Sequence, residues 1–215
     1  MSRAPARPPQ PRGTYRHGDL RRALLDAGVA LARAGGPDAI VLREATRRAG
    51  VVPNAAYRHF ANREALFEAV RAAALAAVAG AMEAELATLG RRRSAAEAAR
   101  AGLRAVGTAY LRFAQQETGL FRTAFATPSA MRGVADPAMA GPGGRNPFEL
   151  LGAALDRMVE AGVLPAARRA GAEFLAWSAV HGLAMLVIDG PLRRFGRAEI
   201  DALGQRVLDM VEQGL

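Results

Sequence analysis

Three histidines are the residues in this sequence best suited to proton transfer or metal binding. They are His17, His59 and His181, and none has a carboxylate three residues before it, as the Glu-x-x-His pairs of helical di-metal sites require. The chain has no cysteine, which excludes disulfides, thiol nucleophiles and thiolate metal sites. It also lacks a glycine-rich phosphate loop and a His-Glu-x-x-His motif. We therefore expect no enzyme, no cofactor and no metal site, and a helical enzyme or binding module is only the competing class.

Arginine is the more informative residue type, because all 29 basic residues are arginine and the formal net charge is +9. Residues 1–70 hold 12 arginines against 6 acidic residues, whereas residues 71–215 hold 17 against 14. The excess charge is therefore concentrated in the first third of the chain. This asymmetry is typical of a phosphate-binding head on a nearly neutral body, although a solvated basic surface would look the same.

The elements that must position these residues are all predicted to be helices. Apolar residues recur at helical spacing from Leu20 onwards, and no run of alternating strand residues is present. Later helical patterns cover 147–161, 167–188 and 197–213, after a Pro- and Gly-rich segment at 127–146 that we expect to be a loop with at most a short helix. We expect an all-α fold of about nine to ten helices.

The N-terminal segment 1–17 is rich in Pro and Arg, which predicts a flexible basic arm. We expect it to add non-specific attraction to DNA rather than to enter a minor groove. It has no apolar region of the kind that a secretory signal needs. The longest uncharged apolar stretch, 174–188, is shorter than the roughly 20 residues that span a bilayer. These features predict a cytoplasmic protein without a membrane segment.

Residues 41–60 form a helix-turn-helix pattern. Leu42–Ala49 is predicted as the first helix, and Gly50 stands where the chain needs a left-handed residue to turn. Pro53 follows at a position suited to the first turn of the second helix, which ends near Phe60. A helix this small fits the major groove of DNA. Any αα-hairpin with a glycine turn shows the same pattern, so the pattern alone leaves DNA binding open.

The surrounding residues resemble the DNA-binding domain of the TetR family. The resemblance rests on Gly50-Val51, Tyr57-Arg58-His59-Phe60 and Arg63-Glu64-Ala65-Leu66, and it covers about residues 18–70 in detail. It implies a DNA-binding domain at 18–66 and a helical ligand-binding and dimerisation domain at 67–215. Family membership would make the protein a transcriptional regulator, usually a repressor, that binds double-stranded operator DNA.

The resemblance also implies roles for single residues. Those expected to contact base edges or phosphates are Arg43, Pro53, Asn54, Ala55, Tyr57, Arg58, His59 and Arg63. His59 has an alternative role as a neutral packing residue. Several positions depart from the family pattern. Val41 and Val52 stand where a helix-capping Ser or Thr is usual, Thr46 stands where Ala is usual, and Ala56 replaces a larger apolar residue. At Val52 a common phosphate contact is lost as well.

A helix-turn-helix monomer reads few base pairs, so we expect a homodimer. The helix at 167–188 is apolar nearly all round, so it must be buried on every face. We expect it to pack both within the chain and against a second copy across a two-fold axis. The helix at 147–161 is its expected packing partner. The residues predicted at the interface are Leu151, Leu155, Phe174, Val180, Ala184 and Val187.

Trp177, His181 and Gly182 resemble the Trp-His-Gly signature of one subclass of TetR C-terminal domains. Trp177 and His181 lie one helical turn apart, which favours a cavity for a small, largely apolar effector that releases the protein from DNA. The predicted wall residues are Phe113, Phe121, Phe125, Met158, Trp177, His181 and Met185. A core histidine among packed aromatics, in a DNA-binding protein without any ligand, is the alternative.

Overall fold

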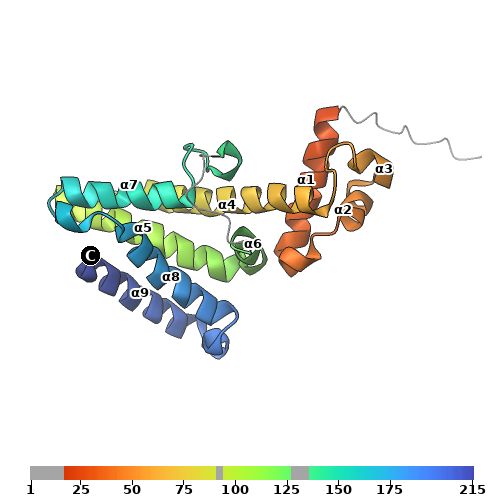
Figure 1. Cartoon of the computed structure of the whole chain (residues 1–215). Coiled ribbons are helices and arrows are strands. Elements are labelled where there is room, and N and C mark those ends of the chain that lie inside the picture. Colours follow the sequence, from red (N-terminus) through yellow and green to blue (C-terminus); the bar gives the residue numbers. More distant parts are fainter. Residues whose placement is uncertain (1–16, 91–93, 127–135) are drawn as a thin grey trace, which may run out of the picture.

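The computed structural model describes residues 17–90, 94–126 and 136–215, and in these ranges every regular element is a helix. This confirms the predicted all-α fold (Figure 1). The nine α-helices within those ranges are α1 His17–Gly35, α2 Leu42–Ala49, α3 Pro53–Ala56, α4 Arg63–Ala87, α5 Ala95–Gln116, α6 Thr118–Ala124, α7 Pro147–Glu160, α8 Ala172–Ile188 and α9 Arg197–Gly214. Short 3-10 turns are η1 Pro37–Ala39, η2 Pro137–Met139, η3 Ala166–Arg168 and η4 Pro191–Arg194.

A small head is formed by α1, α2 and α3 at one end of α4 (Figure 1). Its core holds Leu24, Leu42, Phe60 and Leu66, all buried. The side chain of Asn62 caps α4 by accepting a hydrogen bond from the amide of Ala65, as its position predicts. The helix then continues for 25 residues into the body. The domain boundary expected at residues 66 and 67 therefore falls inside a continuous helix.

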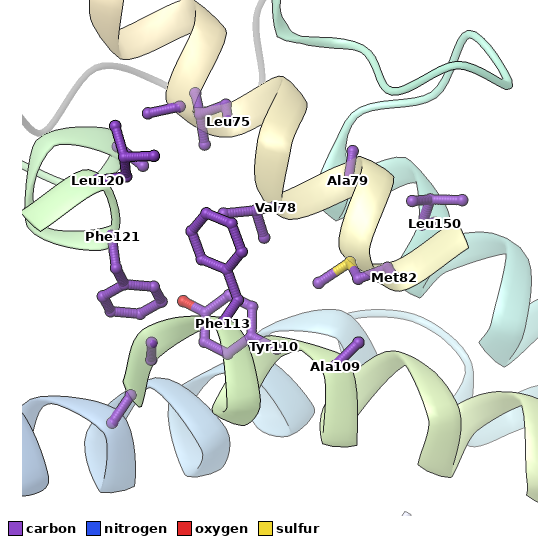
Figure 2. Close-up of a cluster of buried hydrophobic side chains, with 14 of the residues drawn as sticks. Leu75, Val78, Ala79, Met82, Ala109, Tyr110, Phe113, Leu120, Phe121 and Leu150 are labelled. Atoms are coloured by element: carbon purple, nitrogen blue, oxygen red, sulfur yellow. The ribbon is translucent and has the colours of Figure 1, made fainter. Parts of the chain in front are cut away.

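The body is organised around α5, which contacts α4, α6, α7, α8 and α9. Figure 2 shows the centre of its core, where Leu75, Val78 and Met82 of α4 lie opposite Tyr110 and Phe113 of α5. By length and composition α4 could cross a membrane, but it packs against α1, α5, α6 and α7. Its apolar residues therefore belong to the core.

Two segments differ from what the sequence predicts, and two further predicted segments lie outside the described residues. The helix expected at 167–188 begins only at Ala172, because Gly171 adopts a left-handed conformation (φ +80°) after the turn η3. A separate helix, α6, follows a break at Glu117 that the sequence did not predict. The basic arm at 1–16 and residues 127–135 of the predicted loop lie outside the described residues. The described remainder of that loop contains only η2, and its Gly143 amide donates to the Glu83 carboxylate of α4.

Candidate nucleic-acid interface and ligand cavity

The helix-turn-helix has the local geometry that its sequence predicts. Helix α2 ends at Gly50 in a left-handed conformation (φ +69°), and the next amide, Val51, bonds back to the carbonyl of Thr46 at 3.1 Å. Pro53 occupies the first turn of α3. The amides of His59 and Phe60 then both bond to the carbonyl of Ala56 at 2.9 Å. These bonds, with Ala56 and Phe60 fully buried, fix α3 against the rest of the head.

Both helices of the motif lack a side-chain cap. Val41 and Val52 occupy the N-cap positions in extended conformations, and neither provides a cap hydrogen bond. Both side chains are exposed, Val52 to 69%. An unprotected N-terminus leaves backbone N–H groups accessible to outside acceptors.

Most of the predicted DNA contacts lie on the outer surface of the head. Arg43, Asn54, Tyr57, Arg58 and Arg63 are exposed. Ala55 and His59 are half-buried. The side chain of Pro53 lies outside what the structure describes. The helix-turn-helix therefore presents the guanidinium groups of Arg43 and Arg58, the amide of Asn54 and the phenol of Tyr57 to solvent.

Charge on this surface is only partly neutralised. Glu44 pairs with Arg47 and Arg48, and these guanidinium groups lower the pKa of the Glu44 carboxyl to about 2. No described acidic side chain pairs with Arg43 or Arg58. Their charge is available to phosphate groups, for which arginine is well suited.

Arg63 has a structural contact that the sequence did not reveal. Its Nε donates to the carbonyl of Ile40 at 2.9 Å and its Nη2 donates to the carbonyl of Pro37 at 3.2 Å. The guanidinium thus ties the start of α4 to the segment before α2. Backbone carbonyls do not neutralise its charge, so a phosphate contact stays a prediction for this residue.

The body contains an apolar cavity of about 40 Å³ between α4, α5, α7, α8 and α9. Its walls include Met82, Leu103, Phe148, Leu151, Trp177 and Leu208. Of the seven predicted pocket residues, Trp177 lines this cavity, whereas Phe113, Phe121 and Met158 are packed into the core. His181, Phe125 and Met185 are half-buried, and their side chains do not line the cavity.

His181 belongs to a hydrogen-bonded aromatic cluster. The hydroxyl of Tyr110 lies 2.7 Å from Nδ1 of His181, and the indole Nε1 of Trp177 donates to the same hydroxyl at 3.1 Å. The rings of Phe121 and Phe125 pack against His181. Burial raises the pKa of the Tyr110 phenol and lowers the pKa of His181. Nδ1 of His181 therefore has a hydroxyl group as its partner.

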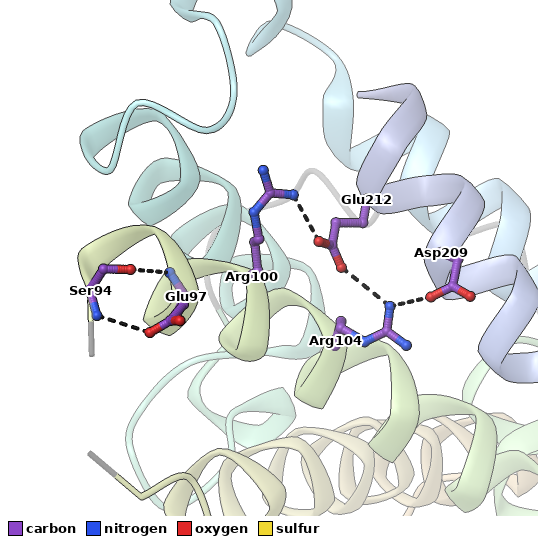
Figure 3. Close-up of polar contacts among 6 residues, drawn as sticks. All are labelled: Ser94, Glu97, Arg100, Arg104, Asp209 and Glu212. Atoms are coloured by element: carbon purple, nitrogen blue, oxygen red, sulfur yellow. Dashed lines mark hydrogen bonds and ion pairs between the residues drawn. The ribbon is translucent and has the colours of Figure 1, made fainter. Parts of the chain in front are cut away.

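Sequence reasoning did not identify Tyr110 or Arg104 as parts of this region. Tyr110 follows Leu103 and Val106 on one apolar face, and a buried phenol nearly always has a polar partner. Arg104 lines the cavity and also binds Gln205 of α9. Figure 3 shows its bonds to Asp209 and Glu212 of α9, together with the bond from Arg100 to Glu212. This network holds α9 against α5.

Most of the residues predicted at a dimer interface are buried within the monomer. Leu151, Leu155, Val180 and Ala184 are buried in its own core, and Phe174 and Val187 are half-buried. The physical reason is that α8 is apolar on all faces, so hydropathy does not indicate which face points outward. The exposed stripe of α8 consists of Leu175, Ser178, Gly182 and Leu186.

Comparison with known protein families decides the assignment. Residues 24–70 match the model of bacterial regulatory proteins of the tetR family. Residues 103–211, just over half of the chain, match the tetracyclin repressor-like C-terminal domain. The chain belongs to the TetR family. It is therefore a DNA-binding transcription regulator and not an enzyme.

Solved structures share the fold of this TetR-family chain. A protein of unknown function from Rhodococcus sp. RHA1 is 26% identical, with a TM-score of 0.73 over 94% of this chain and 98% of that one. A putative tetR family regulator from Shewanella sp. PV-4 is 17% identical, with a TM-score of 0.59 over 88% and 95%. PfmR, a TetR family regulator from Thermus thermophilus, is 21% identical, with a TM-score of 0.53 over 89% and 98%. No curated protein sequence matches the chain.

Proposed function

We propose that this TetR-family regulator is a cytoplasmic homodimeric repressor that leaves its operator when a small, largely apolar ligand enters the body. The proposed DNA binding rests on the side chains exposed on the outer surface of the helix-turn-helix. There Arg43 and Arg58 have no acidic partner among the described residues, and Asn54 and Tyr57 are exposed. Phosphate contacts position such a head and base contacts give it specificity.

A retardation experiment with DNA from the protein's own promoter tests this proposal. We expect retention at low salt and a steep decrease in affinity as salt rises, because bound arginines displace counterions from phosphates. Arg58→Ala should reduce the slope of log affinity against log salt by about one. Arg157→Ala in α7 is the matched control, since this exposed arginine belongs to the body and not to the head. Retention of no promoter fragment at low salt would overturn the proposal.

The dimer is proposed to form through α8 and α9. The stripe Leu175, Ser178, Gly182 and Leu186 carries no charge, and Met210 of the adjoining helix α9 is 59% exposed. Exposed apolar surface of this kind is stabilised by contact with a second copy. Gly182→Arg introduces a charge into the middle of the stripe. We expect the mass measured by light scattering to halve, whereas Arg157→Ala on the exposed side of α7 should leave it unchanged.

The ligand is proposed to bind at the apolar cavity beside Trp177. A volume of about 40 Å³ is far below the roughly 150 Å³ that houses a benzene ring in an engineered cavity. A ligand must therefore move the surrounding helices apart, and its binding energy is then available to shift the head. The ligand acts only through its difference in affinity for the two conformations.

Trp177 makes the ligand proposal directly measurable, because it is the chain's single tryptophan. Titration with benzyl alcohol, an uncharged aromatic probe, should change its emission in a saturable way and weaken operator binding. Ala176→Met fills the cavity from α8 and should abolish both effects, while operator binding without the probe persists. If operator binding is normal and benzyl alcohol and further uncharged apolar probes change neither signal, the alternative of a ligand-independent DNA-binding protein is favoured.

A further inference from the structure

Val52 is the most exposed large apolar side chain in the described part of the molecule, at 69%. It stands at the start of the recognition helix α3 in an extended conformation, φ −73° and ψ 143°. It neither caps the helix nor packs into the core. An apolar side chain in this position gains free energy only when a partner covers it. On the outer surface of a DNA-binding head, that partner is the floor of the major groove.

The residues that follow Val52 are uncharged, and one of them carries a side-chain amide. Asn54 is exposed. The nitrogen of its side-chain amide can donate to N7 of adenine while the amide oxygen accepts from N6. The methyl group of Ala55 is half-exposed beside it. The segment 52–56 contains no charged residue. It therefore lacks the arginine or lysine that most often reads guanine.

Thymine is the base that an apolar side chain can distinguish. In the major groove it presents a C5 methyl group, which no other base has. An apolar residue and an amide side by side thus fit a thymine methyl next to an adenine. The exposed arginines of the motif without an acidic partner among the described residues, Arg43 and Arg58, are left to hold phosphates.

We propose that α3 reads A·T base pairs, with Val52 covering a thymine methyl and Asn54 bonding to an adenine. This inference rests on the proposed binding of operator DNA by the head. It makes Val52 a specificity-determining residue at a position where the family usually has a capping hydroxyl. Each half-site is then expected to contain A·T pairs, and no G·C pair, where α3 enters the groove.

Selection of duplexes from a random library by the full-length protein identifies the contacted positions. Single thymines in the selected sequence are then replaced by uracil, which lacks only the methyl group. For the wild type, one such replacement should weaken binding about 4-fold, the value expected for one buried methyl group. Val52→Ala should bind the thymine and uracil duplexes equally. Equal binding of the two duplexes by the wild type at every position would overturn the role of Val52.

Asn54→Ala tests the second contact. We expect it to lose roughly 5- to 150-fold of the discrimination against the wrong base at one adenine, as for a bidentate contact, with binding to random DNA unchanged. Arg58→Ala is the control, because it should weaken binding to all sequences alike. Selection of G·C pairs at the α3 positions would overturn the proposal while leaving operator binding intact. Failure of the wild type to select any sequence would overturn both.

Discussion

The hydroxyl of Tyr110 on α5 lies 2.7 Å from Nδ1 of His181 on α8, at a sequence separation of 71. Tyr110 is 3% exposed, and burial keeps its phenol protonated by raising its pKa. The hydroxyl has its own hydrogen to donate to Nδ1, and in that arrangement neutral His181 carries its proton on Nε2. Trp177 donates to the same oxygen, so the phenol both donates and accepts.

Removal of this hydroxyl should be costly. Tyr110→Phe leaves Nδ1 of His181 and the indole N–H of Trp177 without their partner, at a cost of about 1–3 kcal/mol in the free energy of unfolding. Urea unfolding monitored by circular dichroism measures it. Tyr57→Phe is the matched control, because Tyr57 is 57% exposed and its change should stay within about 0.5 kcal/mol. Equal effects of the two variants would contradict the assigned role of Tyr110.

Stability should fall as the solution becomes acidic through the range in which His181 titrates. Because burial lowers the pKa of His181 in the folded state, the unfolded chain binds the proton more readily. The contribution of the neutral histidine is thus fully present above about pH 6.5 and is lost as the pH falls towards the lowered value. Melting temperatures between pH 7.5 and 5 measure this, in a range well above the titration of Glu44.

The comparison variant for this pH dependence is His181→Gln, which retains a side-chain acceptor but does not titrate. We expect a lower melting temperature at pH 7.5 and a smaller decrease down to pH 5. A decrease as steep as that of the wild type would assign the effect to other groups.

Gly119 is predicted to be irreplaceable at the contact between head and body. A Cβ atom there would lie 2.3 Å from the carbonyl oxygen of Ala32 and 2.6 Å from that of Arg33, both in the backbone of α1. Gly119→Ala must displace α6 from α1, and we expect a loss of about 1–3 kcal/mol. Gly102→Ala in α5 should have the opposite sign, a gain of up to about 1 kcal/mol, because its Cβ meets no atom closer than 4.0 Å. Thermal unfolding of both variants checks the pair.

The ion-pair network between α5 and α9 should make a salt-dependent contribution. Arg104→Met keeps the aliphatic stem but removes the bonds to Asp209, Glu212 and Gln205. Asp209 is 52% exposed, so we expect a loss of only about 1 kcal/mol in low-salt urea and less in 1 M NaCl. Arg206→Met on the exposed side of α9 should change neither value. A loss for Arg104→Met that is as large in high salt as in low salt would indicate packing instead of charge.

The head could be predicted from the sequence because its signals are local. Gly50 requires a left-handed turn and Pro53 favours the first turn of a helix, and both appear where the sequence places them. Asn62 and Ser94 cap the helices that follow, for the same local reason. Family resemblance adds the expected DNA-facing positions but not the carbonyl contacts of Arg63, which depend on how α4 meets η1.

The body was predicted less well because its contacts join distant parts of the chain. Nothing near Tyr110 indicates His181 as its partner. The break at Glu117 lies in a helical pattern without proline, and the α1 backbone that Gly119 approaches is about 85 residues away in the sequence. For α8, uniform hydropathy concealed which residues face outward, so Val180 was predicted at the interface although it is buried, whereas the exposed Leu175 was not.

The unbroken course of α4 from head to body also has a mechanical consequence. Twenty-five residues at about 1.5 Å each make a rod of roughly 37 Å. A tilt of about 5° at the cavity end would displace the other end by about 3 Å, as much as the length of a hydrogen bond. The regulator can therefore lose register with a rigid double helix through an angular change that hardly disturbs its own packing.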